Sequence, residues 1–177
     1  DGLPWQPTRQ PVTLDEWPAT EPPPDGRITT VLSWNSFGAM EYGGLHYGMK
    51  DESLKALGDL PRKAGSLMEL DVCMIPEAER IWLTEQGWIV LDGHDQLPSP
   101  RSYQGFIRQS RAEIGIAKHG YVVSQCGWFS ERTAVYLASG RPALVQQTGF
   151  SEWLAADRGV IPFVTADDAL SALRDLD

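Results

Sequence analysis

The sequence predicts an α/β protein in which a Rossmann-like, mostly parallel sheet is flanked by helices. Apolar, β-branched segments of strand length alternate along the chain with segments of helical periodicity. Glycine-rich loops follow several of these strands, and 177 residues with 42% hydrophobic content are enough for one domain with a proper core. Strands that are connected through helices pair in parallel, with the helices on both faces of the sheet.

The predicted strands and helices follow one another in regular order. The first strand, "RITTVLSW", leads into the long glycine-rich loop "NSFGAMEYGGLHYGMK". Pro76 and Gly87 mark the start and the end of the second helix. Strands are predicted at 27–34, 66–73, 88–93, 113–120, in the stretch that ends at Gln147, and at 160–164. Helices are predicted at 51–60, 76–87, 101–112, from Ser130 to Gly140, at 151–157 and at 167–177.

The start of the chain differs from the remainder in composition. Residues 1–26 hold most of the prolines and no sustained periodicity, so we expect an extended interdomain or linker segment there and the Rossmann-like domain at 27–177. Trp5, Trp17 and Trp128 are the tryptophans that we expect at an interface. Because the chain begins with an aspartate and stops within a helical pattern, we expect it to be a piece of a longer protein.

Composition excludes several classes of function. A formal net charge of -9 disfavours binding to nucleic acid through broad phosphate neutralisation. No apolar run approaches the roughly 20 residues of a membrane-spanning helix, so we expect a soluble, cytoplasmic protein. Cys73 and Cys126 are expected to be reduced, buried thiols. The three histidines, His46, His94 and His119, form no HxxxH or HExxH pair, so no metal site is expected.

The segment "GWFSERTAVYLASGRP" predicts a loop, a helix and a sharp stop. Ser130 is placed as the N-cap, and Gly140 followed by Pro142 ends the helix. Ala134, Leu137 and Ala138 are expected to form a narrow apolar face that packs on the sheet.

The start of this helix has the features of an anion site. First-turn amides and the guanidinium of Arg132 suit a diphosphate, and Lys118 at the end of the preceding strand adds a second positive charge. Ligands of such folds bind beyond the carboxyl ends of the strands, so the loops after Trp34, Lys118 and Gln147 should carry the site. The alternative interpretation is that Arg132 and Lys118 are solvated surface charges.

The long stretch "YQGFIRQSRAEIGIAKHGYV" with "GWFSERTAVYLASGRPALVQQTGF" resembles the carboxyl-terminal, donor-binding half of bacterial glycosyltransferases with two facing Rossmann-like domains, the GT-B architecture. The closest likeness is to the group with a Gly-Trp-Phe-Ser-Asp/Glu-Arg pattern. "LPWQPTRQPV" and "TVLSWNSFGAMEYGGLHYGMKD" are similar to that group's interdomain segment and first donor-domain strand. The resemblance implies a nucleoside diphosphate sugar as donor substrate, no bound cofactor or metal, and an acceptor domain upstream of this chain.

The resemblance also implies which residues face the donor, while it leaves the catalytic residues unknown. The residues expected to bind the diphosphate are Lys118, His119, Gly120, Gly127, Trp128, Phe129, Ser130, Glu131 and Arg132. Trp34 and Tyr47 are further candidates for stacking, and Lys50 is a further candidate for contacting phosphate or a leaving-group oxygen.

The chain departs from the family pattern at one motif. Retaining members carry a Glu-x7-Glu pair, and here Gly127 and Val135 occupy the two glutamate positions. A non-catalytic Rossmann-like binding module is therefore kept as the alternative. A nicotinamide dehydrogenase is disfavoured, because Gly43, Gly44 and Gly48 do not fit G-x-G-x-x-G.

Overall fold

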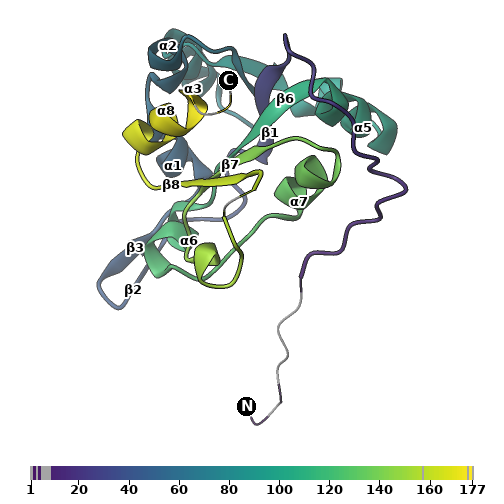
Figure 1. The fold of residues 1–177 in the computed structure, drawn as a ribbon. Coiled ribbons are helices and arrows are strands. Elements are labelled where there is room, and N and C mark those ends of the chain that lie inside the picture. Colours follow the sequence, from purple (N-terminus) through teal and green to yellow (C-terminus); the bar gives the residue numbers. More distant parts are fainter. Residues whose placement is uncertain (1, 3, 5–8, 157, 175, 177) are drawn as a thin grey trace.

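The computed structural model describes residues 2, 4, 9–156, 158–174 and 176, and the expectation for Trp5 lies outside them. Every pairing in its six-stranded sheet is parallel. Helices cover both faces of the sheet (Figure 1). The predicted Rossmann-like α/β fold is thus confirmed. The strands of the sheet are β1 (Arg27–Ser33), β4 (Met68–Cys73), β5 (Ile89–Asp92), β6 (Ser110–Gly115), β7 (Ala143–Gln146) and β8 (Val160–Phe163).

The strand order is β5-β4-β1-β6-β7-β8. The chain starts in the middle of the sheet, builds outward to β5, and then crosses back to β6 before building outward to β8. This is the doubly wound order of dinucleotide-binding folds, and its direction reverses between β1 and β6. The loops after β1 and β6 therefore flank the topological switch point, where such sheets bind ligands.

Figure 1 shows α1, α2, α3 and α8 on one face of the sheet and α5 and α7 on the other. The helices are α1 (Lys50–Leu57), α2 (Leu60–Ala64), α3 (Glu77–Glu85), α4 (Gly93–Gln96), α5 (Pro100–Gln109), α6 (His119–Ser124), α7 (Glu131–Ala138) and α8 (Ala166–Arg174). The helix predicted at 151–157 is wrong, because only a 3-10 turn, Phe150–Glu152, forms there. Trp153 ends that turn, and its indole donates to the Gly127 carbonyl at 3.1 Å. No described helix has the length and apolarity needed to cross a bilayer.

Two apolar clusters hold the layers together. The larger joins β1, β4 and β6 to α1, α2 and α8, with Leu54, Leu70 and Trp88 among its buried members. The smaller lies under the loop before α7 and is built around Phe129 and Phe150, whose ring centroids are 5.5 Å apart. Burial of these side chains supplies the main favourable term in folding, roughly 1.5–3 kcal/mol for each large side chain.

The helix predicted from Ser130 forms as α7, and both of its predicted ends are confirmed. The Ser130 hydroxyl accepts from the Arg132 amide at 3.2 Å, and Gly140 takes a left-handed φ of 79° directly after the C-cap. The predicted apolar face is only partly confirmed, however. Thr133 and Tyr136 are the buried positions of α7, and the Tyr136 hydroxyl lies 2.7 Å from the Thr29 hydroxyl of β1. Of the predicted face, Leu137 is partly buried against the smaller cluster.

The long loop after β1 contains a hairpin that the sequence-based prediction missed. It consists of β2 (Met40–Tyr42) and β3 (Leu45–Tyr47), which pair antiparallel around Gly43 and Gly44. Both glycines have positive φ, 59° and 77°, as a tight two-residue turn of the primed type requires. Figure 1 shows this hairpin beside α6, at the end of the molecule away from α5.

Within the proline-rich segment 1–26, Thr20 and Trp17 contact the domain. The Arg141 guanidinium donates to the carbonyl and the hydroxyl of Thr20 at 2.5 and 2.8 Å. Trp17 lies edge-on to Tyr103 at 5.7 Å between ring centroids. Both cysteines are free thiols, as expected, but the expected burial is wrong, since Cys73 is partly exposed and Cys126 is exposed.

Candidate functional site

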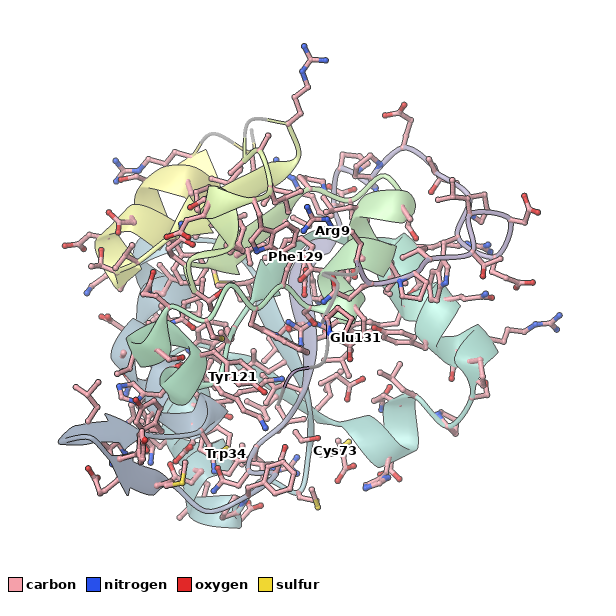
Figure 2. The ribbon with its side chains drawn as sticks, turned by 90° about the horizontal axis from the view of Figure 1, so that it is seen from below. Arg9, Trp34, Cys73, Tyr121, Phe129 and Glu131 are labelled. Carbon is pink, nitrogen blue, oxygen red and sulfur yellow. The ribbon has the colours of Figure 1, made fainter. Side chains whose placement is uncertain are left out.

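The strands β1 and β6 separate at the switch point, and we call the space between them, which the Arg132 side chain occupies, the crevice. β1 pairs with β4 as far as Ser33, but it pairs with β6 only from Arg27 to Thr29, with a register shift at its start. Beyond Thr29 the two strands are no longer bonded to each other, so the carbonyl of Val31 faces β6 without a strand partner on that side. Figure 2 views the molecule from the end where the hairpin and α6 lie.

Arg132 fills this crevice from α7. Its Nε donates to the Glu113 carboxylate of β6 at 2.5 Å, and its Nη1 donates to the Val31 carbonyl of β1 at 2.8 Å. Glu113 is fully buried. Burial opposes the charge of Arg132, but the Glu113 carboxylate outweighs it and raises the guanidinium pKa. The expected grip of Arg132 on two ligand oxygens is therefore not the arrangement in this structure, because the fold itself supplies the anion.

The loop before α7 is held closely by its neighbours. The carbonyls of Gly127, Trp128 and Phe129 accept from Trp153, Thr148 and Gln10, respectively. The recess beside Ser130 and the first turn of α7 measures about 10 Å³, which accommodates a single water molecule at most. The first-turn amides of α7 thus face a shallow surface and not a deep phosphate pocket.

Two lysines lie at the mouth of the crevice. Lys50 is the first residue of α1 and Lys118 is the N-cap residue of α6. Burial, followed by the positive charges of Arg132 and Lys118, lowers the pKa of Lys50 to about 8. Lys118 Nζ lies 4.7 Å from the Phe37 ring centroid and 5.7 Å from that of Tyr121. The mouth of the crevice is therefore a locally positive region on an acidic protein.

A cavity of about 530 Å³ lies on the hairpin side of Lys118. This volume lies within the roughly 300–1,000 Å³ typical of small-ligand sites. Its wall is mostly apolar and aromatic, with one cationic side chain. The lining includes Phe37, Met40, Tyr47, Met49, Lys118 and Tyr121.

The structure separates the predicted site residues into three groups. Lys50, Tyr47, Lys118 and Gly120 lie at the cavity or the mouth of the crevice, and Trp128 stacks beside them on Tyr121 at 5.2 Å between ring centroids.

The second group consists of residues that the fold uses internally. Trp34 is buried in the larger core and Phe129 in the smaller one, so the expectation that Trp34 stacks on a ligand does not hold in this arrangement. Gly127 adopts a φ of 76°, and a Cβ there would lie 3.1 Å from the Trp153 indole nitrogen. These residues shape the loop instead of presenting a side chain to the cavity.

The third group lies to the sides of the site. Glu131 is exposed, and Figure 2 shows it pointing into the open region between α7 and the loop after β1. His119 faces the hairpin, where its Nδ1 accepts from the Gly48 amide at 3.3 Å.

Sequence reasoning missed Phe37, Met40 and Tyr121 as wall residues of the cavity. Phe37 and Met40 were assigned to an undivided loop, and Tyr121 to the loop after a strand. The dipeptide Gly43-Gly44 between "MEY" and "LHY" was the available signal for a hairpin. No local signal indicated that Tyr121 faces the same cavity, since that depends on where α6 packs.

A second buried carboxylate lies in the sheet without a cation. Asp71 of β4 is fully buried, and both of its carboxylate oxygens lack a hydrogen-bond partner among the described residues. Burial first, and then the negative charges of Glu69 and Asp92, raise its pKa to about 6. It lies away from the crevice, on the β5 side of the sheet.

Comparisons of the chain with family models, with curated proteins and with solved structures found no significant match.

Proposed function

We propose that this chain binds a nucleoside diphosphate sugar at the carboxyl ends of β1 and β6, as the donor-binding half of a GT-B glycosyltransferase. The observation that carries the proposal is the cavity of about 530 Å³ at the switch point, which combines aromatic walls with Lys118. Lys50 adds a second, partly desolvated cation at the mouth. The "GWFSER" motif and the helix end "LASGRP" support the same assignment.

The two parts of such a donor match two parts of the site. A diphosphate bound at the mouth would contact Lys118 and Lys50, within the positive field of the α7 amino terminus. A nucleobase or sugar ring would lie in the cavity between Tyr47 and Tyr121, because flat rings stack favourably on aromatic side chains. Arg132 holds α7 against the sheet through Glu113 and Val31 and does not contact the diphosphate.

Transfer in this proposal is promoted electrostatically. As the bond to the sugar breaks, negative charge grows on the departing diphosphate, and the lysines and helix dipole stabilise it. Lys50 is well suited because burial weakens its own solvation and leaves its charge available for a ligand. The acceptor and any general base would come from the upstream domain that the resemblance implies.

Calorimetric titration with nucleoside diphosphates and their sugars tests the binding step. We expect saturable binding that Lys118→Ala weakens by roughly 10–100-fold, the value of a charge-assisted contact of about 1.5–3 kcal/mol. Lys63→Ala is the matched control, because Lys63 is exposed on α2 and pairs with Asp59. Equal affinities for Lys118→Ala and the unaltered chain, or no saturable binding of any nucleotide, would contradict the proposal.

A non-catalytic binding module is the second candidate. It is favoured by Gly127 and Val135 at the positions of the family's glutamates, since neither side chain can hold a sugar hydroxyl. The two candidates differ in how they treat the sugar. A transferase should bind one nucleotide sugar at least about tenfold more tightly than its epimers, a difference of about 1.4 kcal/mol, whereas a module that holds only the nucleotide should bind them equally.

A further inference from the structure

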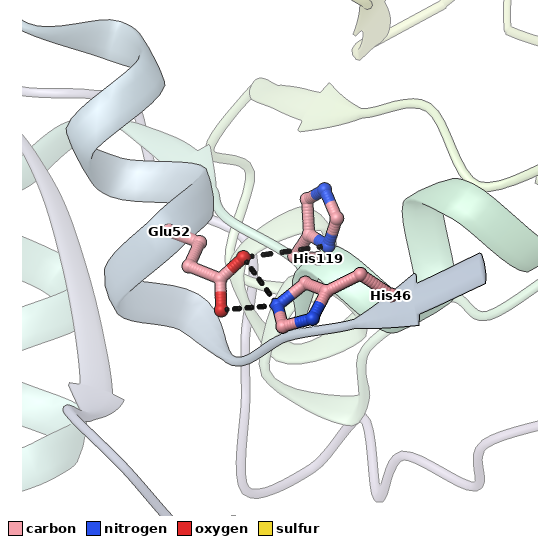
Figure 3. A group of neighbouring side chains, drawn as sticks. All are labelled: His46, Glu52 and His119. Carbon is pink, nitrogen blue, oxygen red and sulfur yellow. Dashed lines mark hydrogen bonds and ion pairs between the residues drawn. The ribbon is translucent and has the colours of Figure 1, made fainter. Parts of the chain in front are cut away.

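Three side chains that could hold a metal ion converge beside the cavity wall. His46 comes from β3, Glu52 from α1 and His119 from α6, and one ligand atom of each lies within 4.8 Å of the others. Figure 3 shows the Glu52 carboxylate placed against both imidazole rings. His46 Nε2 is 2.9 Å from Glu52 Oε1, and His119 Nδ1 is 3.6 Å from Glu52 Oε2.

The hydrogen bonds of His46 define its protonation. Its Nδ1 lies 2.5 Å from a carboxylate oxygen of Glu41, and an ionised carboxylate can only accept, so Nδ1 carries a proton. Its Nε2 faces both oxygens of Glu52, at 2.9 and 3.0 Å. A proton, carried by the ring or by the carboxylate, or a metal ion must therefore lie between Nε2 and Glu52.

His119 supplies the third possible ligand atom. Its Nδ1 accepts a hydrogen bond from the Gly48 amide at 3.3 Å, so this nitrogen carries a lone pair and no proton. Glu52 Oε2 lies 3.6 Å from the same nitrogen. A metal ion bound by all three groups would take this lone pair from the Gly48 amide and would lie between Nδ1 and the Glu52 carboxylate.

We propose that His46, Glu52 and His119 form a binding site for a divalent ion of the zinc type. Two His nitrogens and a carboxylate are a zinc ligand set, and ligands about 2.0–2.1 Å from a tetrahedral ion lie about 3.3 Å apart. The observed separations of 2.9 and 3.6 Å bracket that value. Glu41 on the other nitrogen of His46 is the outer carboxylate that commonly orients a ligating histidine.

The site has an open position and a structural consequence. The His46 side chain is 43% exposed, so water can supply a fourth ligand. The ion would connect the β2–β3 hairpin to α1 and to α6, and the neighbours Tyr47 and Gly120 line the cavity. Occupancy would therefore stiffen the cavity wall, although the proposal does not depend on the nature of the cavity's ligand.

Zinc titration of the 177-residue chain, chelator-treated and free of any histidine tag, tests the proposal. We expect binding that saturates at one ion per chain, and a visible spectrum typical of tetrahedral coordination when Co²⁺ is used. Glu41→Gln should weaken binding by roughly 10–100-fold, and His119→Ala and Glu52→Gln by more than that, because an outer partner costs less than a ligand.

His94→Ala is the matched control, since this remaining histidine lies on α4 outside the cluster and should leave zinc affinity unchanged. Circular dichroism of each variant verifies folding, and the near-isosteric Glu52→Gln decides the outcome if His119→Ala is unstable. The proposal is overturned if the unaltered chain shows no saturable zinc binding, or if the Glu52→Gln variant binds zinc with unchanged affinity.

Discussion

The cations on the two sides of the switch point have different partners. We call the side of α7 the closed side and the side of the hairpin the open side. On the α7 side, Arg132 is committed to Glu113 and to the Val31 carbonyl, and the recess beside it measures about 10 Å³. On the hairpin side, Lys118 lies over aromatic rings beside a cavity of about 530 Å³. A cation is available to a ligand only where the fold does not already supply its anion.

The difference has an energetic basis. Glu113 is fully buried, and an ionised carboxylate in the interior is tolerated only with a partner. Withdrawing Arg132 toward a ligand would leave that carboxylate uncompensated. Lys118 incurs no such penalty, because the aromatic contacts that it would exchange for a phosphate are weak.

The largest expected effect is a loss of stability when the pair of Arg132 and Glu113 is broken. Arg132→Ala should lower the free energy of unfolding by about 3–5 kcal/mol, because it leaves Glu113 as an unpaired buried charge. Urea denaturation measures this loss. Replacing both partners together, Arg132→Met with Glu113→Met, should recover most of the stability, since no charge is then left in the crevice. A change below about 1 kcal/mol in the single variant would show that the pair is effectively exposed.

Asp71 can be compared with Glu113, because both carboxylates are buried but only Glu113 has an arginine partner. Its pKa of about 6 in the folded protein lies above the ordinary value of 3.8, so the folded state binds a proton that the unfolded state releases. Stability should therefore fall as the pH rises from about 4 to 6, and this loss should persist above pH 6.

Asp71→Asn removes the charge and should stabilise the fold at pH 7, on the order of 2 kcal/mol, with little effect at pH 4. Urea denaturation of both proteins from pH 4 to pH 7 measures the difference. If the difference in unfolding free energy between the two proteins is the same at pH 4 and at pH 7, the Asp71 carboxylate titrates normally and is reached by water.

Substitutions in the cavity wall should change the affinity for the ligand and leave the free energy of unfolding nearly unchanged. Tyr121→Ala removes a ring from the cavity wall and should weaken binding of the proposed nucleotide ligand about fivefold, the value of one aromatic contact of roughly 1 kcal/mol. Tyr42→Ala is the control, because Tyr42 is 73% exposed on the hairpin and outside the cavity lining. Equal losses in both variants would place the ligand elsewhere.

The last expected effect is confined to the β2–β3 hairpin. Gly44 has a φ of 77°, and a Cβ there would meet no atom within 4 Å, so Gly44→Val adds backbone strain without a clash. A strain of about 1–2 kcal/mol should speed amide exchange in β2 and β3 while the sheet exchanges as before. Gly38→Val, in the same loop but without positive φ and with equally open space, should change neither. Uniformly faster exchange would show that the hairpin and the core open together.

Much of the fold could be predicted because its signals are local. The order of strands and helices follows from periodicity, and the ends of α7 follow from a serine cap and a left-handed glycine. The helix predicted at 151–157 failed because packing of Trp153 against the loop before α7 overrode a local preference. The hairpin was missed because strands of three residues give almost no alternation to detect.

The residues of the candidate site also differ in whether the sequence could predict them. Lys118 could be proposed from its position after a strand, and the structure places it at the cavity. The partners of Arg132 and the meeting of His46, Glu52 and His119 could not, because each set joins elements that are distant in sequence. Residue type and spacing along the chain do not indicate which distant residues come into contact.

By itself, the sequence determined the parallel α/β alternation, the caps of α7 and the presence of cations near the ends of two strands. Only the tertiary structure decided which of those cations is free, since that depends on whether a buried carboxylate comes within hydrogen-bonding distance. Periodicity and capping act over a few residues along the chain. Charge compensation acts through space, where the interior penalises every unpaired charge. It therefore pairs Arg132 with Glu113, while Lys118 lies over the Phe37 ring.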